Sequence, residues 1–449
     1  MGVGITRRGL LRGGAALGAA ALAGPRVLRC AEPNKLLRLA FVGIGGRGGA
    51  LLGMGGRKNV AVTAVCDCDK RQWPKAAKRY AAAKFYQDYR KMFNEMDKDI
   101  DAVVVATHDP QHVPTSIRAV RLGKAVYCEK PLGYSVHEVR QLAKATAENK
   151  VATQCGNQGH ANEGNRLTVE WIRAGAVGTV KEVHTWTDRP ARYWVHGMKA
   201  IPSQKPCPPE LDWECWLGPR TWPHYHDGLL GMQWRRWYEL GTGAIGDQIC
   251  HGWDNVFWSL DLDSPTAIEP LDLTGKTDIS PPLQSTQRMS FAARGDRPAV
   301  VCSYYTGGRR PPLPEAIAND PDAKRKDLPK TGTLYVGTKG FLVVAGDYGE
   351  SPRLAPEALM RDFNRPERTI PRSPGHAEEW FQAAMGEKSW DFPKSNFTYS
   401  ARLTECGLLA IAAQRAGRKL EYDAAKMLVT NVSEANRYIK PDFRKGWEV

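Results

Sequence analysis

Short apolar runs alternate with longer polar stretches from residue 36 to residue 155. Each run has the length of a strand, and the polar stretches between them have the length of helices. This alternation predicts a parallel sheet covered by helices on both faces, as in an α/β fold. Ser135 and Glu138 form a capping box, which predicts the start of one helix. The predicted strands span residues 36–42, 60–66, 100–106, 125–128 and 151–155.

The rest of the chain predicts a second sheet with closing helices. Residues 309–330 contain many prolines and lysines and are expected to form a loop. At roughly 150 residues per domain, a chain of 449 residues favours two or three domains, and we expect two. The predicted strands span residues 299–305, 333–336 and 341–345, and the predicted helices span residues 376–385 and 399–416.

Residues 184–258 have an unusual composition, with nine of the fourteen tryptophans and five of the ten histidines. We expect an irregular insertion that packs through its indole rings. Aromatic faces beside polar groups also suit sugar rings. Two of the histidines stand on alternate residues without a third ligand nearby, which favours contacts with substrate over a metal site. The candidate substrate contacts are Tyr193, Trp194, His224, His226 and Trp234.

The composition is that of a globular enzyme, with 42% hydrophobic and 25% charged residues. Beyond residue 31, no apolar run approaches the roughly 20 residues needed to span a bilayer, which excludes a polytopic membrane protein. The formal charge is +15, but the basic residues are interleaved with acids, so nucleic acid is not an expected partner. The ten cysteines are irregularly spaced, and we expect neither a zinc site nor an obligatory disulfide framework.

The N-terminus carries a concentrated basic segment. Residues 1–31 contain five arginines and no acid, with Arg7 and Arg8 adjacent and a short Gly/Ala-rich apolar run behind them. This pattern is typical of a twin-arginine signal peptide, which directs export of folded proteins. We therefore expect a periplasmic protein, with cleavage after Ala23 or nearer Ala31. An N-terminal membrane anchor is the alternative, although the run is short for one.

A glycine-rich turn follows the first predicted strand and precedes a predicted helix. Glycines at this position allow a tight turn, close approach of the backbone to a pyrophosphate and close packing of helix on strand. Asp67 ends the second predicted strand, where a carboxylate can accept both ribose hydroxyls of NAD. Arg71 lies just beyond and leaves NADP open. The candidate turn residues are Gly43, Gly45, Gly46, Arg47 and Gly48.

Asp247 and His251 are four residues apart, which places both on one face of a helix. The glycines before them, at 241, 243 and 246, would let such a helix begin close to a ligand. Without further context, an acid at the start of a helix and a buried histidine would explain the same pattern.

Two further segments resemble the signatures of the Gfo/Idh/MocA family of oxidoreductases, the glucose–fructose oxidoreductase and inositol dehydrogenase group. They are residues 106–112 and the stretch 124–132, which contains Glu129-Lys130-Pro131. The resemblance implies a Rossmann domain over residues 36–155. Residues 156–449 would then form an α/β domain for substrate binding and oligomerisation, with a large, open, mainly antiparallel sheet. A homo-oligomer, either a dimer or a tetramer, is expected on the same grounds.

The resemblance also implies roles for individual residues. Lys130, Asp247 and His251 match the catalytic set, with His251 as the base for the substrate hydroxyl. The Lys130–Pro131 peptide is expected to be cis, since it often is in relatives. The positions that match the cofactor side of the cleft are Thr107, Asp109, His112, Glu129, Lys130, Pro131, Asn157 and Gln158.

The expected function is hydride transfer between NAD or NADP and a secondary hydroxyl or ketone of a sugar, sugar derivative or cyclitol. Export favours a tightly bound cofactor that is loaded before transport. A redox-assisted glycosidase is the first alternative, but the exported N-acetylgalactosaminidase branch of the family lacks the Asp-x-x-x-His arrangement present here. A non-enzymatic sugar sensor is the second alternative.

Overall fold

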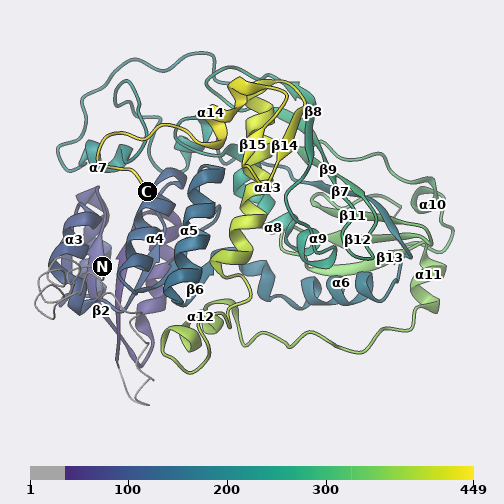
Figure 1. Cartoon of the computed structure of the whole chain (residues 1–449), viewed down its shortest axis with the longest axis horizontal. Helices are drawn as coiled ribbons and strands as arrows, with labels where there is room; N and C mark the ends of the chain where they lie inside the picture. Colours follow the sequence, from purple (N-terminus) through teal and green to yellow (C-terminus); the bar gives the residue numbers. More distant parts are fainter. Residues whose placement is uncertain (1–35, 325) are drawn as a thin grey trace, which may run out of the picture.

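The computed structural model describes residues 36–324 and 326–449. The predicted signal peptide, residues 1–31, lies outside the described residues. The first half of the chain forms a six-stranded parallel sheet in the order β3-β2-β1-β4-β5-β6 (Figure 1). These strands are β1 (Leu37–Val42), β2 (Val60–Cys66), β3 (Lys84–Tyr86), β4 (Ala102–Val105), β5 (Ala125–Cys128) and β6 (Thr153–Cys155).

Five of the six strands lie where the apolar runs predict them. β3 was missed because it has only three residues, one of them an exposed lysine, and so carries no apolar run. Ser135 caps α5, the last helix of this part of the chain: its Oγ accepts from the Glu138 N–H at 3.3 Å and donates to the Glu138 carboxylate at 2.5 Å. The helices are α1 (Gly46–Leu51), α2 (Trp73–Arg79), α3 (Tyr89–Met96), α4 (His112–Arg121) and α5 (Val136–Asn149).

The second half contains a nine-stranded sheet in the order β13-β12-β11-β7-β10-β9-β8-β14-β15. Strands β7 and β10 pair in parallel, and every other pair in this sheet is antiparallel. The predicted fold class is therefore confirmed. The strands are β7 (Val180–Trp186), β8 (Ala267–Thr274), β9 (Gln284–Phe291), β10 (Val300–Thr306), β11 (Gly332–Gly337), β12 (Phe341–Ala345), β13 (Ser351–Ala355), β14 (Leu420–Asp423) and β15 (Leu428–Val429).

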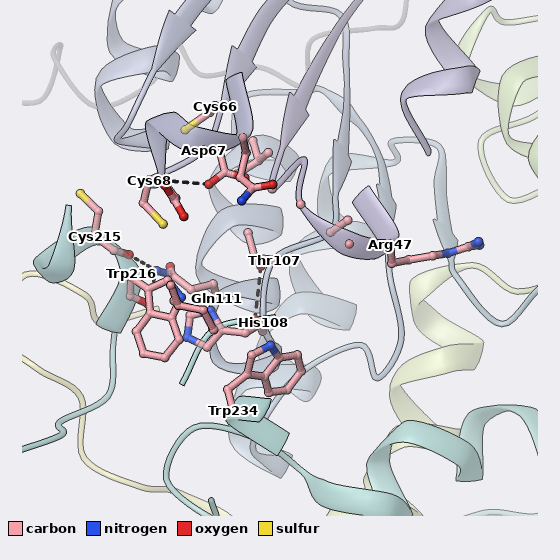
Figure 2. A pocket seen from close by; sticks show the side chains of 18 of the residues that line it. Arg47, Cys66, Asp67, Cys68, Thr107, His108, Gln111, Cys215, Trp216 and Trp234 are labelled. Carbon is pink, nitrogen blue, oxygen red and sulfur yellow. Dashed lines mark hydrogen bonds between the residues drawn. The ribbon is translucent and has the colours of Figure 1, made fainter. Parts of the chain in front are cut away.

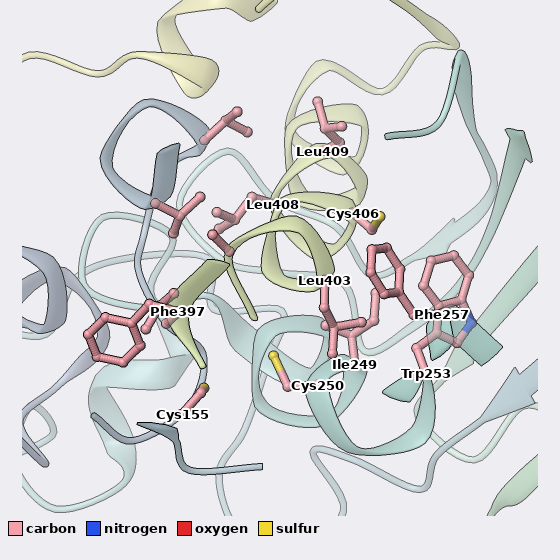
Figure 3. Packing of buried hydrophobic residues seen from close by; sticks show 14 of the residues in the cluster. Cys155, Ile249, Cys250, Trp253, Phe257, Phe397, Leu403, Cys406, Leu408 and Leu409 are labelled. Carbon is pink, nitrogen blue, oxygen red and sulfur yellow. The ribbon is translucent and has the colours of Figure 1, made fainter. Parts of the chain in front are cut away.

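Helices connect the two sheets (Figure 1). Figure 3 shows Ile249 and Cys250 of α8 close to apolar side chains of α13, including Leu403. A Cβ at Gly407 of α13 would lie 2.7 Å from Ile249, so the two helices are in close contact there. The helices of this half are α6 (Glu163–Arg173), α7 (Trp213–Leu217), α8 (Gly243–Gly252), α9 (Asp254–Ser259), α10 (Glu315–Ala318), α11 (Glu357–Asp362), α12 (His376–Ala384), α13 (Phe397–Ala416) and α14 (Asn436–Ile439).

Two late segments return to the first half of the chain. Trp380 and Phe381 of α12 are buried in the same apolar cluster as Phe41 of β1. Near the C-terminus, the indole of Trp447 packs edge-on against Tyr89 of α3, with 6.1 Å between ring centroids. The C-terminal half therefore holds the parallel sheet from two sides. Within the described residues, no helix is both long enough and apolar enough to cross a membrane.

The tryptophan-rich segment between β7 and α8 is mostly irregular, as predicted, and its indoles form a separate apolar cluster. We call residues 205–237 of this segment the strap. It is bound to the loop after β2: the Lys70 N–H donates to the Glu210 carbonyl at 3.0 Å, and the Asp212 N–H donates to the Cys68 carbonyl at 2.9 Å. The strap thus crosses from the second half of the chain onto the parallel sheet.

Candidate active site

The glycine turn between β1 and α1 forms one wall of a cleft. Gly43 has a φ of +80°, and a Cβ there would lie 2.7 Å from the Ala106 backbone. A Cβ at Gly48 would lie 2.1 Å from the Gly43 carbonyl oxygen. These two glycines therefore let the turn pack against its own domain. Gly45 differs, because its nearest neighbour would be a flexible glutamine side chain at 3.4 Å. Its position leaves the backbone open to a ligand.

Asp67, at the end of β2, lies beside this turn (Figure 2). Its carboxylate accepts from the N–H groups of Ile44 and Asp69, each at 2.9 Å. Burial raises the pKa of Asp67 to about 6, even though these N–H groups favour the ionised form. Arg71 donates two hydrogen bonds of 2.7 Å to Asp69 and does not line the cleft. Its guanidinium is therefore already neutralised.

The strap supplies the facing wall of the cleft. The Trp216 indole stacks on the His108 ring, with 4.8 Å between ring centroids and 5° between ring planes (Figure 2). The Trp234 indole contacts the same His108 ring edge-on, with 5.9 Å between centroids. Burial and the neighbouring His112 lower the pKa of His108 to about 3, so the ring is neutral. His108 and Trp216 were missed as site residues, since only the tertiary structure brings them together.

Lys130 and Asp247 meet where the two halves of the chain face each other. The Lys130 ammonium donates to the Asp247 carboxylate at 2.7 Å and to the Asp247 carbonyl at 2.8 Å. The Lys130–Pro131 peptide is cis, as the resemblance implies. A residue from the end of β5 is thus held by a residue of α8, 117 positions later in the chain.

Asp247 is surrounded by cations. Arg235 Nε lies 3.3 Å from one carboxylate oxygen, and Arg189 Nε lies 3.9 Å from the other. Gln248 donates to the carboxylate at 3.0 Å. Burial by itself would raise the pKa of Asp247, but the Lys130 ammonium and the Arg235 guanidinium hold it well below its usual range. Asp247 is therefore an anion at any physiological pH.

His251 lies one helical turn after Asp247 on α8, as the four-residue spacing predicts. Its ring packs edge-on against Tyr348, with 4.6 Å between centroids. Its Nδ1 is buried and has no hydrogen-bond partner among the described residues. Burial, reinforced by the Lys130 charge, lowers the pKa of His251 well below its usual value. The ring is neutral and offers a free nitrogen.

Several predicted cofactor residues fix the loops around the cleft. Asp109 accepts from the Thr242 N–H at 2.9 Å and so ties the loop after β4 to the start of α8. His112 hydrogen-bonds the carbonyls of Pro131, at 2.6 Å, and Thr107, at 3.1 Å. Thr107 lines the cleft, whereas Asp109 and His112 do not. Contact of the last two with a cofactor remains a prediction.

Other predicted residues lie at the edges of the site. Arg47 lines the cleft and donates to Glu129 at 2.9 Å. Asn157 is buried, with an amide nitrogen that has no partner among the described residues. Its neighbour Gln158 is partly exposed at the start of a short 3₁₀ turn.

The five candidate substrate residues separate into two groups. Tyr193, Trp194 and Trp234 lie beside the arginines that face Asp247, with ring-to-guanidinium distances of 4.0 to 5.5 Å. His224 and His226 do not join them. His224 hydrogen-bonds the Pro202 carbonyl at 2.8 Å, and His226 accepts from the Gly228 N–H at 3.1 Å. Among residues 36–324 and 326–449, no three potential ligands are grouped as a metal site.

Comparison with known proteins finds similarity to one oxidoreductase family. Residues 37–157 match the oxidoreductase family with an NAD-binding Rossmann fold, known as GFO_IDH_MocA. The chain is 31% identical over 127 residues to inositol 2-dehydrogenase from Salmonella typhimurium, a match that covers 28% of this chain and 37% of the relative. It is 30% identical over 160 residues to a glycosyl hydrolase family 109 protein from Solibacter usitatus, covering 33% and 36% of the two chains.

A solved structure extends the likeness to the second half of the chain. The WlbA dehydrogenase from Chromobacterium violaceum, solved with NADH and UDP-GlcNAcA, matches with a TM-score of 0.60 and 16% identity. That match covers 89% of this chain and 99% of the other, and it shows a shared fold. The glycine turn, the partly buried acid at the end of β2 and the open backbone at Gly45 fit an NAD molecule. Residues 37–157 of this chain are therefore similar to the NAD-binding Rossmann domain of the Gfo/Idh/MocA oxidoreductase family.

Proposed function

We propose that this protein is an NAD-dependent oxidoreductase acting on a secondary hydroxyl or ketone of a sugar, sugar derivative or cyclitol. The observation that carries the proposal is the contact between Lys130 and Asp247, with His251 one helical turn further along α8. It places an ammonium, a carboxylate and a neutral imidazole from two domains at one position next to an NAD-binding fold.

The glycine turn and Asp67 would hold the pyrophosphate and the ribose of the cofactor. When bound, NAD supplies the hydride acceptor for alcohol oxidation. NAD is favoured over NADP, because Asp67 occupies the ribose position while Arg71 is already paired with Asp69. The strap covers the cleft from the opposite side, which supports a cofactor that stays bound between turnovers.

The chain's own residues divide the proton chemistry. The His251 ring accepts the proton of the substrate hydroxyl, which requires the neutral form that burial maintains. Asp247 remains ionised, so it orients Lys130 and does not donate a proton. The Lys130 ammonium stabilises negative charge that develops on the reacting oxygen.

The test is to purify the protein, quantify the nucleotide that it retains, and monitor nucleotide absorbance during a screen of sugars and cyclitols. Reduction of the nucleotide supports the proposal. His251→Asn is expected to abolish reduction while the bound nucleotide remains. The matched control is His224→Gln, since His224 lies outside the cleft lining and hydrogen-bonds a loop carbonyl. Full turnover by His251→Asn would refute the assignment of the base.

A redox-assisted glycosidase is the second candidate, favoured by the 30% identity to the family 109 protein. Such an enzyme oxidises a ring hydroxyl transiently, eliminates the leaving group from the acidified neighbour position, and returns the hydride. Aryl glycosides added to the same screen separate the two functions. Release of the aglycone without net reduction of the nucleotide favours the glycosidase. No response to either set of compounds favours a sugar sensor.

We also propose export through the twin-arginine machinery to the periplasm, on the evidence of residues 1–31. Cell fractionation with and without Arg7→Lys/Arg8→Lys tests this, because loss of both arginines should retain the protein in the cytoplasm. A homo-oligomer, a dimer or tetramer, is proposed on the basis of the large sheet, where Leu271 of β8 is 44% exposed. Light scattering on the purified protein measures its mass in solution.

A further inference from the structure

Arg235 lies in the strap and lines the cleft beside the catalytic candidates. Its guanidinium carbon is 4.0 Å from the Trp234 ring centroid and 5.5 Å from the Trp194 ring centroid. The side chain is only 14% exposed. Two indoles thus hold the planar guanidinium in place at the edge of the reacting site, and little rotational freedom remains to be lost on binding a ligand.

Most N–H donors of the Arg235 guanidinium have no hydrogen-bond partner among the described residues. Across the described residues, its one ionic contact is Nε to Asp247 at 3.3 Å, and it donates no side-chain hydrogen bond. The same Asp247 oxygen already accepts from Lys130 at 2.7 Å. Arg235 therefore lines the cleft with most of its N–H donors unpaired. Leaving these donors without acceptors costs free energy when the side chain is largely buried, unless a ligand accepts from them.

The ionic contacts beside Asp247 fall into two groups. Arg189 donates to Asp188 at 2.6 Å and lies 3.7 Å from Asp347, and Lys330 contacts Asp188 at 2.8 Å. Those two cations and two anions cancel.

On the inner side of the site, Lys130 and Arg235 share the single carboxylate of Asp247. Arg47 is paired with Glu129, and the His251 ring is neutral. Within the contacts of Lys130, Arg235 and Asp247, one positive charge is left over, and it lies at Arg235.

We propose that Arg235 recognises an anionic group on the substrate, so that the preferred substrate is an acidic sugar such as a uronate. A carboxylate matches the two parallel N–H groups of a guanidinium and would neutralise the surplus charge. A sugar phosphate presents the same chemistry, and the experiment distinguishes the two sources. This inference rests on the proposed function, because it specifies the substrate of the same site.

The first measurement is calorimetric binding to the protein with its nucleotide bound. The ligands are glucuronate against glucose, galacturonate against galactose, and glucose 6-phosphate. The expected result is at least tenfold tighter binding of one or both uronates than of the neutral sugar. Tighter binding of the phosphate than of either uronate would keep an anionic substrate but replace the carboxylate. Equal binding of acidic and neutral sugars, or no binding of any acid, would overturn the inference.

The second measurement compares Arg235→Gln with Arg192→Gln. Arg192 is an exposed arginine at 5.4 Å from the Tyr193 ring and does not line the cleft, so it is the matched control. Arg235→Gln is expected to weaken uronate binding at least tenfold more than it weakens binding of the neutral sugar, whereas Arg192→Gln changes neither. Arg235→Lys keeps the positive charge but lacks the paired N–H donors of a guanidinium, so it should recover part of the lost uronate affinity. The same variant provides the test if Arg235→Gln folds poorly.

These measurements test the acidic substrate and the oxidoreductase activity separately. If neutral sugars reduce the nucleotide as well as acids do and Arg235→Gln reacts normally, the substrate class is wrong and the oxidoreductase stands. If uronates bind through Arg235 but no sugar ever changes the nucleotide absorbance, the oxidoreductase is wrong and the acid-binding site stands.

Discussion

The site has a nucleotide end, at the glycine turn and Asp67, and a reacting end, at Lys130, Asp247 and Arg235. The two ends depend on different physical interactions. At the nucleotide end, the decisive feature is backbone shape: Gly43 and Gly48 permit close packing, and Gly45 leaves a surface open. At the reacting end, the decisive feature is charge, with Lys130, Arg235 and Asp247 in contact. The first end comes almost entirely from one continuous stretch of chain. The second exists only because two domains and the strap meet.

This difference teaches which property each end controls. Backbone shape together with the single Asp67 carboxylate selects and holds a cofactor, since the same turn suits every reaction that uses it. Charge placed between domains acts on the substrate and on the proton. Variants at the nucleotide end should therefore change affinity or folding, and variants at the reacting end should change turnover.

The largest effect is expected for Lys130→Ala. Removing the ammonium takes away the charge that stabilises the reacting oxygen, so kcat should fall by about 10²–10³-fold, while the nucleotide stays bound. Steady-state kinetics and nucleotide quantification measure the two quantities. Lys199→Ala is the control, since Lys199 is exposed and lies outside the cleft lining. If the bound nucleotide of Lys130→Ala falls as much as its kcat, the nucleotide end and the reacting end are not functionally distinct.

Two glycine variants at the nucleotide end distinguish a glycine that is needed for packing from one that leaves the backbone open to NAD. Gly48→Ala forces a Cβ to 2.1 Å from a carbonyl oxygen, so the free energy of unfolding should fall by about 1–3 kcal/mol. Gly45→Ala meets only a flexible side chain, so stability should hold while NAD affinity falls about tenfold through the blocked backbone approach. Urea unfolding and NAD titration give both values. The reverse pattern would contradict the roles assigned to these glycines.

The contribution of the strap is tested at its indoles. Trp216→Ala removes the ring stacked on His108, and the rate of NAD release should rise about tenfold, since one wall of the cleft is lost. Trp222→Ala is the matched control: Trp222 packs on Trp237 in the same cluster but does not line the cleft. Stopped-flow displacement of NAD measures the rate. Similar release from both variants would mean that the strap acts only through its overall packing.

The smallest effect concerns pH. Because burial raises the pKa of Asp67 to about 6, the carboxylate that would accept ribose hydroxyls is lost as pH falls from 7 to 5, and NAD affinity should drop several-fold. Without nucleotide the sign reverses. The folded pKa exceeds the unfolded value, so the contribution of this group to stability declines as pH rises from about 4 to about 6. Titrations and thermal unfolding at each pH check both trends, and Asp67→Asn should flatten them.

The sequence predicts the nucleotide end well for a physical reason. Its strands are short buried runs, its turn needs glycine at fixed positions, and Asp67 follows the next strand, so all the signals are local. Arg71 shows the limit of this reasoning. Its place in the sequence suits a 2′-phosphate, yet its Nε and Nη2 already donate to Asp69.

The reacting end was predictable only in part. The four-residue spacing of Asp247 and His251 is a local property of a helix, and α8 bears it out. Their contact with Lys130, the stacking of Trp216 on His108 and the surplus charge at Arg235 depend on distances across the fold. No periodicity encodes such contacts, and for the same reason the sequence could not separate His224 and His226 from the cleft.

The sequence by itself determined the α/β class, five of the six strands of the parallel sheet, the glycine turn and the helical spacing of the acid and the histidine. These follow from steric limits on the backbone and from the burial of apolar residues, which act between near neighbours in the chain. Only the tertiary structure decided that the strap covers the cleft, that Asp247 holds Lys130, and that Arg235 is left with an unbalanced charge. Electrostatic interactions act through space, so their balance is set by which segments the fold brings together.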